Sequence, residues 1–200
     1  MSNGMVYLVD DDAAIRDALA WLLRTRGIET RAWASAEEFL AAYNGEMCGC
    51  LLLDIRMRAM GGLELYDRLR ALDCRMPTIF LTGHGDVPMA VQALKAGAID
   101  FLEKPFADTA LVERIEAALA QEKSRRWRDA EREQLDRQLA SLTEREHEVM
   151  ALILAGKLNK VIADELKIAM RTVEVHRARV FEKMAVKSAV ELARLLLGSR

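Results

Sequence analysis

The chain has 200 residues, 52% of them hydrophobic, which is enough to bury a core in each of one or two domains. No apolar run reaches the roughly 18 residues of a membrane span and no basic and apolar signal region opens the chain, so we expect a cytoplasmic protein without membrane contact. The net charge of −2 combines −6 over residues 1–120 with +4 over residues 121–200, which suits a divalent cation and a phosphate backbone respectively, although solvated surface charge explains either.

Short apolar runs alternate with amphipathic segments over the first 120 residues. The runs predict strands at 5–9, 29–32, 51–54, 78–82 and 100–102. The segments predict helices at 13–26, 35–42, 62–72 and 87–96, and a last helix from Asp108. The uniformly apolar strands indicate a parallel sheet that is covered on both faces. We therefore predict an open, doubly wound α/β fold, of the flavodoxin-like (βα)5 type with strand order 2-1-3-4-5.

A helical linker is predicted after this domain. No Gly or Pro interrupts residues 111–142, so the last helix can continue. The stretch 122–133 is too polar to be buried, whereas Leu135, Leu139 and Leu142 restart an apolar stripe. A solvated helical connector and a dimerising seam both fit this stripe.

Carboxylates follow two of the predicted strands. Asp10, Asp11 and Asp12 follow the first, and Asp54 ends the third. With the order 2-1-3-4-5 these strand ends are neighbours, so three or four carboxylates converge on one pocket. Because like charges within about 4–6 Å oppose one another's ionisation, a divalent cation is the expected remedy. The oxygen-only donors favour Mg²⁺ over Zn²⁺.

The fourth and fifth strands add a hydroxyl and an ammonium group at the same edge. Thr82 ends the fourth strand, and Lys104 follows the fifth. A metal, a hydroxyl and a cation are what a phosphoryl group on a carboxylate needs around its oxygens, so Asp54 is the expected nucleophile of an in-line phosphoryl transfer. Each residue alone is more often a helix cap or an ordinary surface residue. The prediction depends on their combination.

Four segments resemble the receiver domain of two-component response regulators: VDDD at 9–12, LDIRM at 53–57, FLTGHGDVPM at 80–89 and FLEKPF at 101–106. The resemblance covers residues 4–120. It implies a phosphoacceptor, Asp54; metal ligands, Asp10, Asp11, Asp54 and Arg56; phosphoryl contacts, Thr82 and Lys104; and an aromatic switch, Phe101. The resemblance also implies that Asp10 binds the metal ion through a water molecule and that Arg56 binds it through its backbone carbonyl. The phosphoryl group comes from a phosphohistidine on a sensor histidine kinase.

Two positions depart from the receiver pattern. Receivers usually have proline after the methionine of the Asp-x-x-Met segment, where this chain has Arg58, and aspartate before the second glycine, where it has Gly61. Both lie in the loop after Asp54. They leave the acidic residues in place and put the shape of that loop in question, together with kinase choice or phosphoryl lifetime.

Residues 143–200 have an all-helical pattern, in which Thr143-x-x-Glu146 and Ser188-x-x-Glu191 mark two helix starts. Segments 159–166 and 171–184, separated by a four-residue break, predict a helix-turn-helix. Val173, Val180 and Met184 fall on its packing side. Glu174, Arg177 and Ala178 fall elsewhere and are free to face DNA, while Lys160, Arg171 and Lys183 can anchor its backbone. Thr172 and Val175 complete the set of expected DNA-binding residues.

This second region resembles the LuxR-type DNA-binding domain over residues 140–197, through LTEREHEV at 142–149 and RTVEVH at 171–176. The resemblance implies that Glu174, Val175 and Ala178 face bases and that the helix at 188–197 pairs two subunits. Ala169 replaces the serine that commonly caps the recognition helix, which forfeits about 1 kcal/mol. Without the resemblance, composition favours a small helical protein-interaction domain, against which the +3 charge of residues 171–187 argues.

Both resemblances together identify a response regulator of the FixJ/NarL-like subfamily, with a receiver at 4–120, a helical linker at 121–140 and a LuxR-type helix-turn-helix at 141–200. They imply a transcription regulator in which phosphorylation promotes homodimerisation through the surface of residues 87–96 and the last strand, and then binding to double-stranded promoter DNA. Activation with RNA polymerase is the expected outcome, although these residues do not distinguish it from repression.

Two alternative hypotheses assign the chain to other functional classes. A haloacid-dehalogenase-like phosphatase also uses Mg²⁺ and an aspartate, but it needs Asp-x-Asp-x-Thr or Val, and here Asp12 is followed by Ala13 and Ala14. A phosphorylation-dependent adaptor that does not touch DNA is the other alternative. We expect no enzymatic activity beyond self-phosphorylation from a phosphohistidine donor and self-dephosphorylation.

Overall fold

The computed structural model describes residues 4–83 and 87–198. The chain divides into two compact units, Met1–Arg126 and Trp127–Arg200. Within the described ranges, no helix combines the length and the apolar character that crossing a membrane requires.

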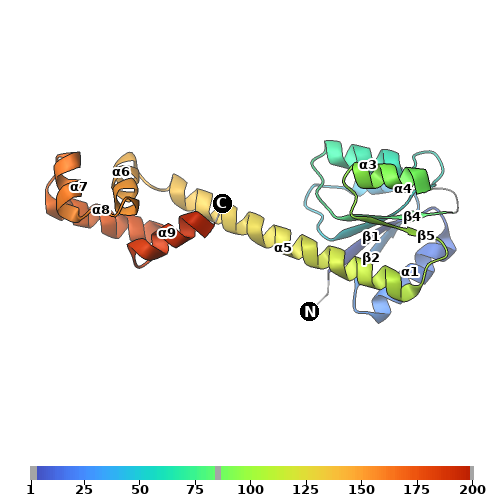
Figure 1. The fold of residues 1–200 in the computed structure, drawn as a ribbon. Helices are drawn as coiled ribbons and strands as arrows, with labels where there is room; N and C mark the ends of the chain where they lie inside the picture. The colour runs from blue at the N-terminus through green and yellow to red at the C-terminus, as the bar shows by residue number, and fades with distance from the viewer. Residues whose placement is uncertain (1–3, 84–86, 199–200) are drawn as a thin grey trace. The chain divides into compact units, whose positions relative to one another are not determined.

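Five parallel strands form one sheet in the first unit, in the order β2-β1-β3-β4-β5 (Figure 1). They are β1 (Met5–Val9), β2 (Glu29–Trp33), β3 (Cys50–Asp54), β4 (Thr78–Thr82) and β5 (Asp100–Glu103). Every residue of β3 and β4 is buried, as expected for central strands that are covered on both faces. The predicted α/β class and strand order are confirmed.

Helices cover both faces of this sheet. They are α1 (Ala13–Thr25), α2 (Ala36–Ala42), α3 (Gly62–Ala71), α4 (Val87–Lys95) and α5 (Asp108–Ala140). One core joins Leu52 of the sheet to Leu23 of α1 and Ile115 of α5. The core on the other face contains residues of α2, α3 and α4, and Figure 1 shows α3 and α4 on that face. The sheet is thus held from both sides, which fixes the strand ends that carry the predicted site.

Several predicted element boundaries shift by one residue. The strand after α1 continues to Trp33, because Trp33 pairs with Val9. The last strand continues to Glu103, because Glu103 pairs with Thr82. Neither shift moves a predicted site residue to another element.

The helix α5 continues without interruption to Ala140, as the absence of Gly and Pro predicted. Leu135 and Leu142 are buried in the core of the second unit, and Leu139 packs against the same core. For these leucines a solvated connector is therefore wrong, whereas a dimerising seam stays a prediction. The leucines belong to the core of the C-terminal unit itself.

One residue of the polar stretch of α5 also differs from the prediction. Glu122 is only 5% exposed, although the stretch was expected to be too polar for burial. Arg125 compensates the buried charge, since its guanidinium donates hydrogen bonds of 3.0 and 2.8 Å to the two Glu122 oxygens. A planar arginine one helical turn away can satisfy both oxygens at once, which a composition argument does not capture.

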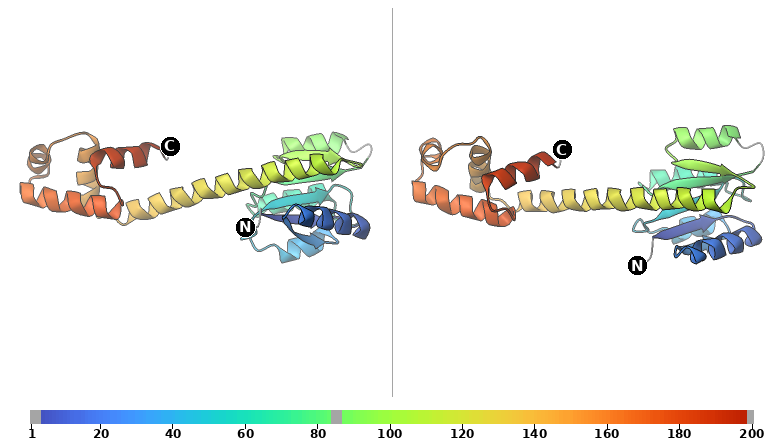
Figure 2. Two further views of the ribbon diagram at one scale, coloured as in Figure 1. Left: turned by 90° about the horizontal axis from the view of Figure 1, so that it is seen from below. Right: turned by 60° about the horizontal axis from the view of Figure 1, so that its bottom comes forward.

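The second unit adds four helices around its own core (Figures 1 and 2). They are α6 (Glu144–Leu154), α7 (Asn159–Leu166), α8 (Met170–Lys183) and α9 (Ala189–Gly198). Val149, Ile162 and Val173 are fully buried at the centre of this core. An all-helical C-terminal unit was predicted, and it is confirmed.

Candidate metal centre and nucleic-acid interface

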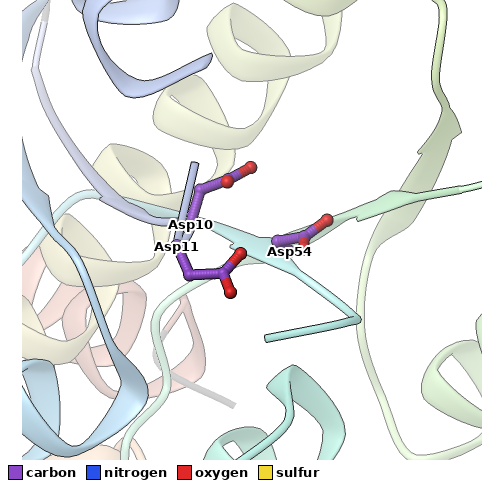
Figure 3. A group of neighbouring side chains, drawn as sticks. All are labelled: Asp10, Asp11 and Asp54. Carbon is purple, nitrogen blue, oxygen red and sulfur yellow. The ribbon is translucent and has the colours of Figure 1, made fainter. Parts of the chain in front are cut away.

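The ends of β1 and β3 bring three carboxylates together. Val9 pairs with Leu53, so Asp10 and Asp11 leave β1 beside Asp54 at the end of β3 (Figure 3). One oxygen of each carboxylate lies within 4.8 Å of the others. Carboxylate oxygens are the ligands that Mg²⁺ prefers, so the donor type suits this ion.

The fourth acidic residue of this region has a different role. The Asp12 side chain accepts the backbone N–H of Ala14 at 2.8 Å and caps the start of α1. The Asp12 N–H in turn donates to Asp10 Oδ1 at 2.8 Å. The sequence left three or four converging carboxylates open, and the structure brings together three.

A lysine from the end of β5 enters the same pocket. Lys104 Nζ lies 2.8 Å from Asp10 Oδ2 and 2.9 Å from Asp54 Oδ1. Burial raises the pKa of Asp54, and the charges of Asp10 and Asp11 add to this effect, while Lys104 offsets part of it. Although its own burial works in the opposite direction, hydrogen bonds to Asp10 and Asp54 raise the pKa of Lys104. The ammonium alone does not balance the three carboxylates, which favours a further cation.

The hydroxyl and the aromatic ring predicted for the site lie at its β4 and β5 side. Thr82 is fully buried, and its Oγ1 donates to the backbone oxygen of Leu102 at 3.4 Å. Phe101 is half-buried and packs against the core of α2, α3 and α4. The backbone N–H of Lys104 donates to the backbone oxygen of Thr82 at 2.7 Å, so the ends of β4 and β5 are joined. Residues 84–86 of the FLTGHGDVPM segment lie outside the described residues.

The loop after Asp54 approaches the site very closely. A Cβ on Gly62 would lie 2.1 Å from the Asp54 backbone oxygen, so this position accepts only glycine without a shift of backbone. Gly61 is the N-cap residue of α3 and supplies no side-chain cap. Arg56 is exposed in the same loop, where the predicted use of its carbonyl as a metal ligand stays a prediction. Sequence reasoning placed a helix start at Gly62 and missed its contact with Asp54.

Arg16 and Arg58 contact the aspartates that follow β1, and the sequence did not indicate either contact. Arg16 of α1 donates to the backbone oxygen of Asp10 at 2.7 Å. The backbone N–H of Arg58 donates to Asp11 Oδ2 at 3.3 Å, and Arg58 Nε lies 3.5 Å from the same oxygen. The one available signal was that Arg58 departs from the receiver pattern.

In the second unit, α7 and α8 form the predicted helix-turn-helix. The break between them has three residues rather than four, because α8 begins at Met170: Ala169 is extended and its backbone oxygen accepts the N–H of Thr172. Ala169 caps α8 without a side-chain hydrogen bond, as predicted. Val173 and Val180, predicted for the packing side, are fully buried, and Met184 is 1% exposed.

Most residues expected to face DNA lie on the solvent side of this motif. The exposed ones are Lys160, Arg171, Thr172, Glu174, Val175 and Ala178. Arg177 is half-buried, and its guanidinium lies 5.4 Å from the centre of the Phe181 ring. A shallow hollow on α8 is lined by Met170, Arg171, Glu174, Val175 and Ala178. Within the C-terminal unit these side chains are exposed to solvent.

Lys183 has a second role that the sequence did not suggest. Its Nζ donates to Glu146 Oε2 at 2.6 Å and to the Ser141 backbone oxygen at 2.8 Å. Glu146 is 2% exposed, and the hydrogen bond from Lys183 is the largest of the effects that lower the pKa of Glu146 to about 2. Since these bonds occupy the ammonium within the unit, a contact of Lys183 with DNA stays a prediction that competes with them.

Two predicted capping boxes mark helix starts in this unit. Thr143 Oγ1 accepts the Glu146 N–H and Glu146 accepts the Thr143 N–H, so the first box is complete. Ser188 Oγ accepts the Glu191 N–H at 3.2 Å, but the Glu191 carboxylate accepts from Lys187 instead of Ser188. The second box is therefore formed in one direction only.

Comparisons with known families and proteins cover most of the chain. The model of the response regulator receiver domain matches residues 6–116, and the model of bacterial regulatory proteins of the luxR family matches residues 140–196. The C4-dicarboxylate transport transcriptional regulatory protein DctR of Rhodobacter capsulatus is 50% identical, over 95% of this chain and 98% of that protein. The transcriptional regulatory protein FixJ of Bradyrhizobium diazoefficiens is 43% identical, over 98% and 96%.

Solved structures agree with these similarities. The response regulator StyR is 43% identical, covers 97% of this chain and 98% of its own, and has a TM-score of 0.92. Full-length FixJ from B. japonicum is also 43% identical, covers 100% and 98%, and has a TM-score of 0.64.

Proposed function

Because the chain belongs to the two-component response regulators that join a receiver domain to a LuxR-type DNA-binding domain, we propose that it is a transcription regulator switched by phosphorylation of Asp54. The observation that carries this proposal is the pocket in which Asp10, Asp11 and Asp54 converge and Lys104 contacts two of them. The proposed parts are a receiver at 4–120, a helical linker at 121–140 and a DNA-binding domain at 141–200.

The proposed chemistry is phosphoryl transfer from a histidine kinase. An Asp54 oxygen attacks the phosphorus of a phosphohistidine, so a P–O bond forms while the P–N bond breaks and the electron pair returns to the imidazole. Lys104, already 2.9 Å from Asp54, neutralises charge on the transferred oxygens. Asp10, Asp11, Asp54 and the Arg56 carbonyl would hold Mg²⁺, which supplies the remaining positive charge at the phosphoryl group.

The proposed switch begins at Thr82. The Thr82 hydroxyl leaves the Leu102 oxygen for the new phosphoryl oxygens, and Phe101 then rotates inward. The surface of α4 and β5 changes with them and pairs two chains. Val91 and Leu94 of α4 are 41% and 38% exposed, which offers apolar surface for such a dimer.

The proposed output is binding to promoter DNA. A dimer places two copies of α8 on half-sites about one helical turn apart. Glu174, Val175 and Ala178 read bases, helped by Thr172 and Arg177, while Lys160 and Arg171 contact phosphates. We propose that the bound dimer activates transcription with RNA polymerase in the cytoplasm, and that the chain has no enzymatic activity beyond transfer to Asp54 and loss of that phosphoryl group.

The test is phosphorylation in the absence of a kinase. The purified chain and Asp54→Asn are incubated with phosphoramidate, with and without Mg²⁺, and intact mass is recorded. The proposal predicts one added phosphoryl group on the wild type, only with Mg²⁺, and none on the variant. A wild type that never gains mass, or a variant that gains it equally, would contradict the assignment of Asp54.

A further inference from the structure

Arg58 contacts the predicted metal ligand Asp11 through two groups. Its backbone N–H donates to Asp11 Oδ2 at 3.3 Å, and its Nε lies 3.5 Å from the same oxygen. The Arg58 side chain is 93% exposed and that of Asp11 is 26% exposed. A proline, which receivers usually have here, could offer neither contact, because it has no N–H and no charge.

Among the described residues, Lys104 and Arg58 each form ion pairs with carboxylates of the pocket. Lys104 lies at hydrogen-bond distance from Asp10 and Asp54, whereas Arg58 lies at Asp11. Lys104 is largely enclosed, while Arg58 can leave into solvent with little loss. Asp11 thus has a partner that is attached loosely and can be displaced.

A cation at this position opposes a divalent ion on the same carboxylates. One unit charge and a divalent ion about 6 Å apart in water repel each other enough to weaken binding about tenfold. Solvent exposure of Arg58 and dissolved salt reduce this repulsion. We therefore expect Arg58 to weaken Mg²⁺ binding by at least about threefold. The guanidinium also competes with a metal ion for Asp11 Oδ2.

We propose that Arg58 is a positioning residue that acts through Asp11 and weakens Mg²⁺ binding by the receiver. The proposal rests on the proposed function, because it concerns the same carboxylate pocket. Its consequence is a receiver whose readiness for phosphorylation depends on the free Mg²⁺ concentration and on ionic strength. A receiver with an uncharged residue in place of Arg58 would be saturated at lower Mg²⁺.

The test measures Mg²⁺ affinity without any phosphoryl donor. The full-length chain, labelled with ¹⁵N, is titrated with MgCl₂ at constant ionic strength while the backbone amide shift of Ile55, next to Asp54, is followed by NMR. The variants are Arg58→Ala, Arg58→Gln and Arg58→Lys. Arg75→Ala is the matched control, since Arg75 is an exposed arginine that pairs with Asp73 in the loop before β4.

We expect the Kd for Mg²⁺ to fall about threefold to tenfold in Arg58→Ala and Arg58→Gln. Arg58→Lys, which keeps the charge, should stay within about twofold of the wild type, and Arg75→Ala should equal it. Raising the salt concentration from about 0.1 M to about 0.5 M should shrink the gain of the neutral variants, because the repulsion is screened.

The outcomes separate this proposal from the proposed function. A wild type that binds Mg²⁺ while both neutral variants bind it equally or more weakly overturns the role of Arg58 and leaves the phosphorylation site standing. A gain in Arg58→Lys as large as in Arg58→Gln also overturns it, because charge would not be the cause. A wild type without Mg²⁺ binding contradicts the proposed function and this inference together.

Discussion

The ammonium of Lys104 lies 2.9 Å from Asp54 Oδ1, although 50 residues separate the two along the chain. Parallel strands explain this proximity, because β3 and β5 flank β4 and end at the same edge of the sheet. The cation is therefore in place at the expected phosphoacceptor before any transfer. Asp54 is 7% exposed, so water hydrates its carboxylate only weakly.

Lys104→Met should slow phosphorylation of Asp54 by phosphoramidate about a hundredfold, because one preorganised cation at the transferred oxygens is lost. The rate is measured from intact mass against time at saturating Mg²⁺. Lys95→Met is the control, since Lys95 is exposed at the end of α4. Equal rates for Lys104→Met and the wild type would exclude Lys104 from the transfer.

Gly62→Ala should destabilise the receiver by about 1–3 kcal/mol, because the new Cβ would lie 2.1 Å from the Asp54 backbone oxygen. Gly61→Ala is the comparison: its Cβ would meet the Ile55 oxygen at 3.3 Å, so we expect less than half of that loss. Urea unfolding of the full-length variants measures both. If the two variants lost the same free energy, the close approach at Gly62 would not explain the result.

Glu146→Gln should lower the stability of the C-terminal unit at neutral pH by about 2 kcal/mol, because the buried partner of Lys183 loses its charge. The folded-state pKa of Glu146, about 2, lies below its usual value of 4.5. The charged form therefore stabilises the fold above pH 4.5, and this contribution is lost as the pH falls from 4.5 towards 2. The difference in unfolding free energy between the wild type and the variant, measured against pH, should shrink over this window. A constant difference would contradict the ion pair.

Arg171→Ala should weaken DNA binding similarly for all sequences and reduce the slope of log affinity against log salt by about 1, as expected for a phosphate contact. Lys183→Met should lower the melting temperature, because the Lys183 ammonium is bound to Glu146 and Ser141, and its slope tests the predicted contact of Lys183 with DNA. Fluorescence anisotropy at several salt concentrations measures both slopes. A reduced slope in Lys183→Met would show that this lysine reaches DNA as well.

The sequence predicted the sheet and most of the site because each depends on local patterns. Apolar runs give strands, their order follows from the doubly wound fold, and residues at the ends of those strands then meet at one edge. The same reasoning placed Asp10, Asp11, Asp54 and Lys104 together.

The features that were missed depend on contacts between distant segments. The packing of Leu135 follows from helices that come after it in the chain. The contact of Arg58 with Asp11 joins residues 47 apart, and no periodicity predicts it. Hydrophobic patterns show which residues are buried, and three-dimensional packing decides their partners.

The most direct test of the account is the DNA affinity of the full-length chain before and after phosphorylation. A duplex selected from a randomised pool is titrated with the wild type and with Asp54→Asn, each treated with Mg²⁺ and phosphoramidate or left untreated. We predict that treatment lowers the Kd of the wild type at least about tenfold and leaves that of Asp54→Asn unchanged. Equal affinities for treated and untreated wild type, or an equal gain in Asp54→Asn, would contradict control of DNA binding by Asp54.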